Sequence, residues 1–310
     1  MIGTCLILSS IYDFSVDLVI QELEKRNTDY LRINKETLHN YEIKLNPVTK
    51  ELHIAGDGVN RTIINVKSIW FRQAVFLRNT PGDALSLEEQ LSRSQWSAFL
   101  RGLMVFEDSY WMNWPASTYA AESKPYQLMI ASEVGFKVPD TEIGNSFRDS
   151  KILNSKVIVK SLDTVLLRDG DDCLFTYTSD VEPSELTKDR ISSAPLTVQQ
   201  YITEKTDIRV TIIGDDIFAV KITSNGAGIE DDWRLTKREL IEYTDIELPI
   251  DLIEKCRKYM KKLSLNFGAI DFIESNGEYY FIEINPTGEW GWLSNEQRKI
   301  ETYIADALSQ

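Results

Sequence analysis

Three oxygen-bearing side chains near the C-terminal end of the sequence have a spacing that could hold a metal ion. Asp271 lies in one strand-like run, and Glu283 and Asn285 lie in the next. Glu283 and Asn285 share a face, because side chains two apart in a strand point the same way. Two carboxylates and an amide oxygen are hard ligands of the kind that Mg²⁺ takes. A solvated hairpin face is the alternative, but an unpaired carboxylate in the apolar run 279–284 would be costly.

The turn between these two runs decides whether the two carboxylates meet. A two-residue turn at Asn276 and Gly277 would point Asp271 and Glu283 to opposite faces. A three-residue loop over 275–277, with Gly277 left-handed, would put both carboxylates on one face. We therefore predict the three-residue loop. A tight turn without a bulge would exclude a shared metal site.

A second predicted hairpin contributes basic residues. Its strands, 207–213 and 217–221, flank the tripeptide Gly214-Asp215-Asp216. If all three residues form the loop, Arg209 lies directly opposite Lys221, where like charges repel. A phosphate between them would turn this repulsion into attraction, because Arg offers a bidentate fork and Lys a point charge. Two basic side chains that diverge into water are an equally good interpretation of the residues alone.

Other polar residues are less specific in isolation. Lys160 ends the β-branched run 157–160 and Lys124 begins a predicted helix, but a lysine usually lies on the surface. The tripeptide Asp232-Trp233-Arg234 could equally be a polar loop with a packed tryptophan. A predicted strand ends in four residues that could be plain sheet: Gln199, Gln200, Tyr201 and Ile202.

The rarest residue types exclude several reactions. The two histidines, His39 and His53, lack metal-ligand spacing, which argues against a zinc hydrolase and a His-based triad. Catalysis must then rest on carboxylates, lysines, arginines and a cofactor. The three cysteines, Cys5, Cys173 and Cys256, are far apart, which predicts reduced thiols in a cytoplasm.

The overall composition excludes several kinds of partner. The chain has 310 residues, with 34 basic and 48 acidic ones, so its formal net charge is −14. An acidic chain is unlike a general nucleic-acid binder, whose binding face is basic. No apolar run approaches the roughly 20 residues of a membrane span, and no basic segment typical of a signal peptide is present. We expect a cytoplasmic protein without nucleic-acid or membrane partners.

The elements that must position these residues suggest about two domains of mixed α/β character. The first part predicts a strand, a helix and a strand at 4–8, 14–25 and 30–33, without a Gly-rich phosphate turn. Four short alternating segments then predict a meander, at 41–46, 51–55, 60–66 and 68–72. A helix over 86–108 is expected to begin with a Ser86 cap and Glu89.

The second part begins after a boundary at Trp111–Pro115. A helix that starts at Ser123-Lys124-Pro125 is expected to end at Gly135. The remaining periodicity predicts strands and helices at 155–161, 197–202, 207–213, 217–223, 251–263, 268–274, 279–285 and 294–308.

Taken in this order, the polar residues resemble the ATP-grasp superfamily over roughly 115–310. The resemblance implies an α/β fold with an N-terminal pre-ATP-grasp domain, a central domain and a C-terminal antiparallel-sheet domain, at 1–115, 116–198 and 199–310. It implies ATP and Mg²⁺ as cofactors, with metal ligands Asp271, Glu283 and Asn285. It implies that the nucleotide is bound by Lys124, Lys160, Gln199, Gln200, Tyr201, Ile202, Asp207 and Asn285.

Within that superfamily the chain most resembles the microviridin-type graspetide macrocyclases. The motifs that carry this likeness are Trp70-Phe71-Arg72, the run 206–222 (TDIRVTIIGDDIFAVKI), Asp232-Trp233-Arg234 and the run 283–290 (EINPTGEW). Two departures are the single Gly170 in 161–178, where many members have a Gly-rich loop, and Gln73, where a second arginine is common.

This likeness implies a ligase that closes rings in a ribosomal precursor peptide with a leader and an acidic core. ATP would activate Glu or Asp side chains as acyl phosphates for attack by a Thr or Ser hydroxyl, giving an ester, or a Lys amine, giving an amide. It implies a possible homodimer. The residues expected to act on the substrate are Arg209, Lys221, Arg234 and Asp232, with Arg72 and Trp233 in contact with it.

Two other functions stay open at this point. One is a glutamate-adding ATP-grasp ligase that acts on a protein or peptide terminus, which would share the ATP site. The other is a non-catalytic ATP-binding module. A degenerate site has little reason to keep the buried charge of Asp271, Glu283 and Asn285, which argues against the module.

Overall fold

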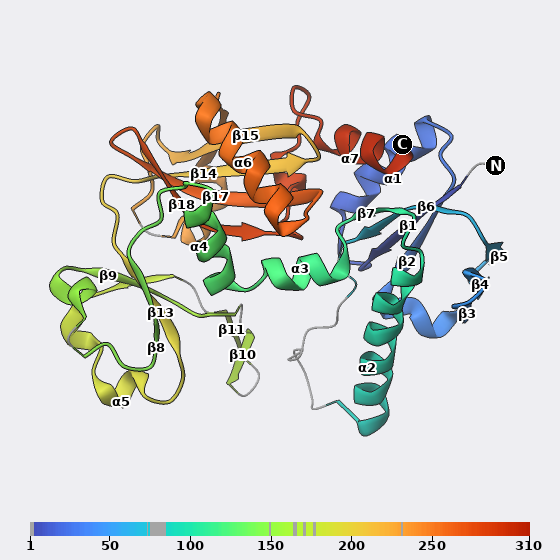
Figure 1. Ribbon diagram of the computed structural model, residues 1–310, viewed down its shortest axis with the longest axis horizontal. Coiled ribbons are helices and arrows are strands. Elements are labelled where there is room, and N and C mark those ends of the chain that lie inside the picture. Colours follow the sequence, from blue (N-terminus) through green and yellow to red (C-terminus); the bar gives the residue numbers. More distant parts are fainter. Residues whose placement is uncertain are drawn as a thin grey trace.

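The computed structural model describes residues 3–72, 74, 85–148, 150–163, 166–169, 172–175, 178–230 and 232–310, the segments 166–169 and 172–175 by their backbone only. Gln73 and Gly170, the two departures noted above, lie outside the described residues. Figure 1 shows an N-terminal part, a central sheet and a C-terminal part of the described chain.

A parallel sheet organises the N-terminal part. Its four strands have the order β2-β1-β6-β7 and the bounds Tyr30–Asn34, Thr4–Ser9, Val66–Phe71 and Tyr110–Met112. Successive β1 side chains enter two different cores, because a strand alternates its side chains between faces: Cys5 and Ile7 on one side, Leu6 and Leu8 on the other. The sheet is therefore buried on both faces, as parallel sheets usually are.

Helices cover both faces of this sheet. The first face packs against α1 (Ser15–Lys25) and the C-terminal helix α7 (Ile300–Ser309). The second packs against the end of α2 (Leu87–Gly102). The predicted capping box at the start of α2 is confirmed, since the Ser86 hydroxyl accepts from the Glu89 amide and the Glu89 carboxylate accepts from the Ser86 amide.

The four short segments predicted as one meander divide between two sheets. Three of them form the antiparallel sheet β3-β4-β5, with bounds Glu42–Asn46, Glu51–Gly56 and Val59–Ile63. The fourth, β6, pairs in parallel with β1 instead. Alternating hydrophobicity marks a strand but does not specify its partner, so this part of the prediction was wrong.

The last predicted helix also begins later than expected, at Ile300 instead of 294. The Asn295 side chain accepts hydrogen bonds from the amides of Gln297 and Arg298. Such side-chain bonds offer the backbone an alternative to the helical ones, and the chain here turns before the helix starts.

Two helices and a small sheet follow β7. They are α3 (Pro115–Ala121) and α4 (Lys124–Glu133). Gly135 ends α4 as predicted, and its conformation is left-handed, with φ 89°. The central antiparallel sheet has the order β12-β9-β13-β8, with bounds Ser179–Val181, Val157–Lys160, Leu196–Gln200 and Thr141–Gly144. A separate hairpin pairs β10 (Leu166–Asp169) with β11 (Asp172–Phe175), and α5 covers Lys188–Ile191.

A five-stranded antiparallel sheet forms the C-terminal part. Its order is β16-β15-β14-β17-β18, with bounds Ile241–Asp245, Asp216–Ser224, Thr206–Ile213, Phe267–Ser275 and Glu278–Asn285. Helices α4 and α6 (Ile250–Leu263) pack on one face through a large apolar cluster. Figure 1 shows this sheet above the central sheet, with α4 beside β18.

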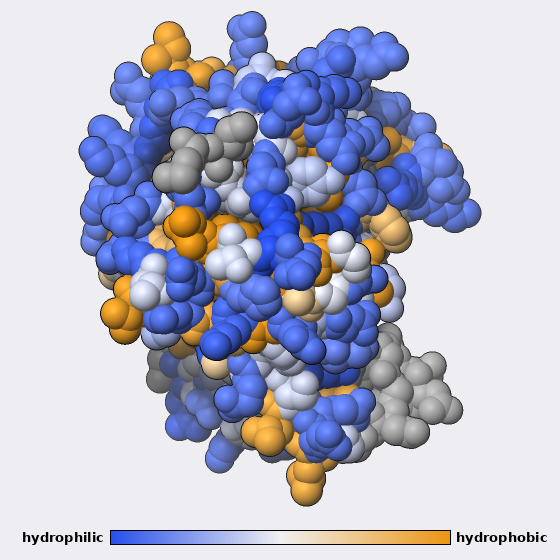
Figure 2. Space-filling model, turned by 90° about the vertical axis from the view of Figure 1, so that its right-hand side faces the viewer, coloured by the Kyte–Doolittle hydropathy of each residue, from blue (hydrophilic) through white to orange (hydrophobic). Residues whose placement is uncertain are grey.

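The outer face at the β3–β5 end is mostly hydrophilic, with hydrophobic residues in small groups (Figure 2). This agrees with the acidic composition. In the part of the chain that is described, no helix has both the length and the apolarity of a membrane span.

Candidate active site

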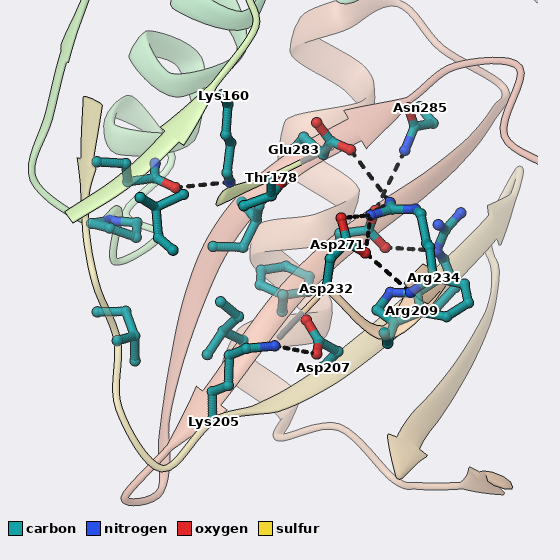
Figure 3. Close-up of a pocket in the computed structure, with 18 of the residues that line it drawn as sticks. Lys160, Thr178, Lys205, Asp207, Arg209, Asp232, Arg234, Asp271, Glu283 and Asn285 are labelled. Atoms are coloured by element: carbon teal, nitrogen blue, oxygen red, sulfur yellow. Dashed lines mark hydrogen bonds and ion pairs between the residues drawn. The ribbon is translucent and has the colours of Figure 1, made fainter. Parts of the chain in front are cut away.

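A pocket of about 950 Å³ is lined by residues of both the central and the C-terminal sheet. Figure 3 shows Lys160 of the central sheet on one side and Asp271, Glu283 and Asn285 of the C-terminal sheet on the other. The pocket therefore collects side chains from strands that are more than a hundred residues apart in sequence.

The turn between β17 and β18 differs from the one predicted. Ser275 pairs with Glu278, so the turn contains only Asn276 and Gly277, with φ of 53° and 78°. Two left-handed residues are typical of a tight hairpin turn. The predicted three-residue loop was wrong.

A bulge further along restores the arrangement that the metal hypothesis needs. Phe272 pairs with Phe281, but the next pair along is Asp271 with Glu283, so Ile282 is an extra residue on β18. Beyond this bulge Glu283 lies directly opposite Asp271, and Asn285 lies opposite Ala269 on the same face. The two carboxylates and the amide therefore meet at one end of the pocket.

Cations surround the two carboxylates. Lys124 Nζ lies 2.6 Å from Glu283 Oε2, and Arg209 Nε lies 2.6 Å from Asp271 Oδ1. The Arg209 contact is an ion pair only, because this buried nitrogen makes no hydrogen bond. The Arg234 guanidinium lies 3.7 Å from an Asp271 oxygen and 3.9 Å from a Glu283 oxygen, so one cation is shared by both.

Burial and these charges shift the pKa values of the two carboxyl groups in opposite directions. Burial would raise the pKa of Glu283, but the charges of Lys124 and Lys160 outweigh it and lower the pKa to about 2. Burial raises the pKa of Asp271, although Arg209 acts against the rise. A facing pair of carboxylates with a shared cation is a fitting seat for a divalent metal ion, whose charge would replace that of the guanidinium.

Beyond Lys160 the pocket is more apolar. Lys160 Nζ donates to Gln199 Oε1 over 3.0 Å, and burial lowers the pKa of this lysine to about 8. The strand end from Gln199 to Ile202 lines the same wall, together with the apolar side chains of Ile158, Ile273 and Ile282. An apolar slot beside a buried cation suits a ligand with a ring and phosphate groups.

Acidic and aromatic residues also line the pocket. Asp207 accepts from Lys205 Nζ over 2.7 Å, and burial raises its pKa despite that partner. Asp232 accepts from the Arg234 amide and caps the short turn that carries Trp233. Trp233 lies against Trp292, with ring centroids 5.5 Å apart.

The fold around this pocket is shared with solved structures. A RiPP-associated ATP-grasp ligase from Chryseobacterium gregarium, in complex with ADP and a leader and core peptide, matches with a TM-score of 0.87. The two are 25% identical over 99% of this chain and 96% of that one. No protein-family model matches the sequence, and no curated protein does. The chain has the ATP-grasp fold.

Two macrocyclases from Microcystis aeruginosa MRC have the same ATP-grasp fold. MdnC, bound with the precursor peptide MdnA, has a TM-score of 0.83 and 24% identity over 98% of this chain and 99% of its own. MdnB has a TM-score of 0.78 and 25% identity over 99% of each chain. The resemblance seen in the sequence is confirmed, as is the fold class.

The ATP-grasp pocket contains most of the residues that the sequence singled out. They are Lys124, Lys160, Gln199, Gln200, Tyr201, Ile202, Asp207, Arg209, Asp232, Trp233, Arg234, Asp271, Glu283 and Asn285. The structure thus brings together every predicted nucleotide and metal ligand, while the role of each remains a prediction.

Lys221 is an exception. The β14–β15 turn contains only Gly214 and Asp215, so Lys221 pairs with Ile208 and Arg209 pairs with Val220. Lys221 therefore lies on the other face of the sheet from Arg209 and does not line the pocket. The predicted phosphate between Arg209 and Lys221 was wrong, because the loop is one residue shorter than assumed and the register moves by one.

Arg72 is the second exception, since it is buried and does not line the pocket. Its Nε donates to Asp13 over 3.0 Å and its Nη2 donates to Glu289 over 2.7 Å. Its Nη1 donates to the carbonyls of Thr287 and Gly288. All three nitrogens are thus used within the protein, and this corrects the predicted substrate contact: Arg72 holds the loop that follows β18.

Sequence reasoning missed Lys205, Glu230 and the segment 178–180, which also line the pocket. Lys205 could have been found, because it lies two residues before Asp207 in an extended run and so shares its face. No local pattern indicated Glu230 or 178–180, which come from loops and a strand edge.

Proposed function

We propose that this protein is an ATP-dependent ligase that joins side chains of a ribosomal precursor peptide into rings. One observation supports this most: Asp271 and Glu283 face each other in a pocket that also contains Lys160 and an apolar slot. The ligases with the same fold, which include complexes with ADP and with precursor peptides, support the same assignment.

The nucleotide would lie along the pocket from the apolar slot to the carboxylates. The backbone from Gln199 to Ile202 would bind adenine, and Asp207 would accept from the ribose hydroxyls. Lys124 and Lys160 would bind the phosphates, as point charges with no base chemistry. Lys160 is suited to this because it is buried and burial disfavours its charged form. A phosphate beside it would stabilise that charge.

Mg²⁺ fits the acidic end. Asp271, Glu283 and Asn285 would hold it, and when bound it would neutralise charge on the transferring phosphoryl group. Arg234 now lies beside both carboxylates, and its side chain is 41% exposed, so it has room to turn toward a substrate.

The reaction needs positioning more than a nucleophilic residue. The γ-phosphoryl group of ATP passes to a Glu or Asp side chain of the peptide, giving an acyl phosphate and ADP. A Thr or Ser hydroxyl, or a Lys amine, of the same peptide then attacks the carbonyl carbon and loses its proton, and inorganic phosphate leaves. Arg209 and Arg234 would stabilise the acyl phosphate, and Trp233 would form a wall for the peptide.

The finer features of the partner belong to the same proposal. The peptide would have a leader that docks away from the pocket and an acidic core that enters it. The products would be ω-esters or ω-amides, the protein a homodimer, and its location the cytoplasm. The buried free thiols of Cys5 and Cys256 support that location.

Mass spectrometry tests the function directly. The enzyme is incubated with ATP, Mg²⁺ and precursor peptides with acidic cores from the same genome. Ring closure predicts the loss of one water per ring, with one ADP and one phosphate released for each. Glutamate addition would instead increase the mass, and an ATP-binding module would change nothing.

Matched variants tie the result to the site. Glu283→Ala should abolish water loss, because it removes a carboxylate from the proposed metal seat. Lys221→Ala should retain it, because Lys221 lies on the other face of the same sheet. If intact precursors show no water loss with the wild-type enzyme, the ring-forming function is wrong.

A further inference from the structure

The outer edge of β18 has hydrogen-bond partners from outside its sheet. β18 is the last strand of the five-stranded sheet, so one of its edges has no neighbouring strand. The Phe281 amide on that edge donates to the Lys137 carbonyl over 2.8 Å. At Ile284 the partner is a side chain, the amide of Gln127 from α4.

The Gln127 amide acts like the peptide group of a missing strand. The Ile284 amide donates to Gln127 Oε1 over 3.0 Å, and Gln127 Nε2 donates to the Ile284 carbonyl over 2.9 Å. Gln127 Nε2 also donates to the Ala121 carbonyl over 2.6 Å. Gln127 is only 3% exposed, so the loss of its side-chain amide would leave three buried backbone groups without a partner.

These contacts are possible only in the bulged register. In a regular strand, backbone groups that point to one edge recur at every second residue. Phe281 and Ile284 both use the outer edge although they are three apart, because the extra residue Ile282 lies between them. Without the bulge, Asp271 would face Ile282 and Glu283 would point to the opposite side of the sheet.

Packing supports the same register. The side chains of Phe281 and Ile284 are both buried in the cluster under α4 and α6. Gly268 leaves the room for Ile284, since a Cβ there would lie 2.8 Å from Ile284 Cδ1. Packing alone cannot align the backbone along the edge, however, because apolar contact has no direction. The Gln127 amide supplies that alignment.

The same helix also contacts the neighbouring side chain. Lys124 lies three residues before Gln127, on the same face of α4, and its Nζ is 2.6 Å from Glu283. Further along, the Asn113 side-chain amide donates to the Pro286 carbonyl over 2.9 Å. The segment with the proposed metal ligands Glu283 and Asn285 is thus attached to elements from earlier in the chain.

We propose that Gln127 is a positioning residue: its amide holds β18 in the bulged register that places Glu283 opposite Asp271 and Asn285 beside it. The effect on the metal site rests on the proposed function. The alignment of β18 by the Gln127 amide does not. Gln127 itself lines no part of the pocket and would touch neither metal nor substrate.

The test compares two variants of the full chain. Gln127→Met keeps the length of the side chain and removes its hydrogen bonds to Ile284. Tyr259→Phe is the matched control, because the Tyr259 hydroxyl donates to the backbone carbonyl of Gln127 over 3.2 Å and is also buried. The control thus removes a buried hydrogen bond at the same residue but leaves the Gln127 amide in place. Gln127→Leu serves if Gln127→Met does not fold, since its side chain can neither accept from the Ile284 amide nor donate to the Ile284 carbonyl.

Two measurements are made. Hydrogen exchange of the Ile284 amide, without nucleotide or metal, should become about tenfold faster or more in Gln127→Met and stay near wild type in Tyr259→Phe. Mn²⁺ affinity in the presence of ADP, measured by electron paramagnetic resonance, should fall about 10- to 100-fold in Gln127→Met only. ADP affinity in EDTA should change less than about twofold, because the proposed adenine-binding residues 199–202 belong to the central sheet and the strand end after it, not to β18.

The outcomes separate the two proposals. Unchanged exchange at Ile284 in Gln127→Met overturns the positioning role, and so does an equal loss of Mn²⁺ affinity in Tyr259→Phe. If the wild type binds no Mn²⁺ with ADP, the proposed metal seat fails, and exchange at Ile284 still decides whether Gln127 aligns the strand.

Discussion

Replacing Glu283 by glutamine removes one negative charge from a site in which carboxylates and basic side chains compensate one another. The pKa of Glu283 is about 2 and that of an ordinary glutamate is 4.5, because Lys124 and Lys160 together outweigh the cost of burial. The side chain is 20% exposed, so solvent screens these interactions only in part. The ionised form is thus favoured in the folded protein, and Glu283→Gln should destabilise it.

The size and pH dependence of the loss follow from that difference. At about 1.4 kcal/mol per unit of pKa, the difference between 4.5 and about 2 corresponds to about 3 kcal/mol at pH 7. A lowered pKa in the folded state stabilises it above the unfolded value, and the stabilisation disappears as the pH falls through the folded value. The gap between wild type and variant should therefore be constant above about pH 5 and shrink to about 2 kcal/mol near pH 3.5.

Urea unfolding of both proteins between pH 7 and pH 3.5, without nucleotide or metal, measures the gap. Glu278→Gln is the matched control on the same strand, because the Glu278 carboxylate lies 3.6 Å from Lys137 and both side chains are about half exposed. Its effect should stay below about 1 kcal/mol at every pH. A Glu283→Gln protein as stable as wild type at pH 7, or a gap that grows toward low pH, would refute the electrostatic account of the seat.

Three further predictions concern the rest of the site. Because the pKa of Lys160 is about 8, binding of ADP at pH 8 should take up a fraction of a proton, and calorimetry in buffers of different ionisation enthalpy should detect it; heats that do not depend on the buffer would contradict the phosphate contact. Arg209→Gln should reduce turnover by at least about tenfold, whereas Lys221→Gln should change it less than about twofold, and steady-state kinetics that find equal effects would contradict the assignment of faces. Arg72→Met should lower the free energy of unfolding by about 3–5 kcal/mol in urea, because it leaves Asp13 buried without its cation; a loss near zero would show that the loop after β18 is held by other contacts.

Most of the residues that line the pocket could be singled out from the sequence. A carboxylate in an apolar strand, as at Glu283, is costly unless it has a partner, so it indicates a site by itself. Lys160 was not informative alone and was singled out by its order along the chain, through the resemblance to the ATP-grasp superfamily. The Ser86–Glu89 capping box was likewise predictable, since both partners lie within one helical turn.

Register was where sequence reasoning failed, and it failed twice for the same reason. Both hairpins have two-residue turns where three-residue loops were expected. At β14–β15 the error moved Lys221 to the wrong face. At β17–β18 a bulge at Ile282 compensated for the tight turn, so Asp271 and Glu283 reached the predicted common face by a different route.

The sequence by itself determined which groups are available: two acids in apolar strands, a few lysines and arginines and almost no histidine, a set that suits phosphoryl chemistry with a metal ion. Only the tertiary structure decided how they face one another. The bulge at Ile282 depends on the Gln127 amide and on the room beside Gly268, and the loop after β18 depends on Arg72. These contacts join residues far apart in sequence. A shift of a strand by one residue changes the local energy little, but it moves every side chain to the opposite face of the sheet.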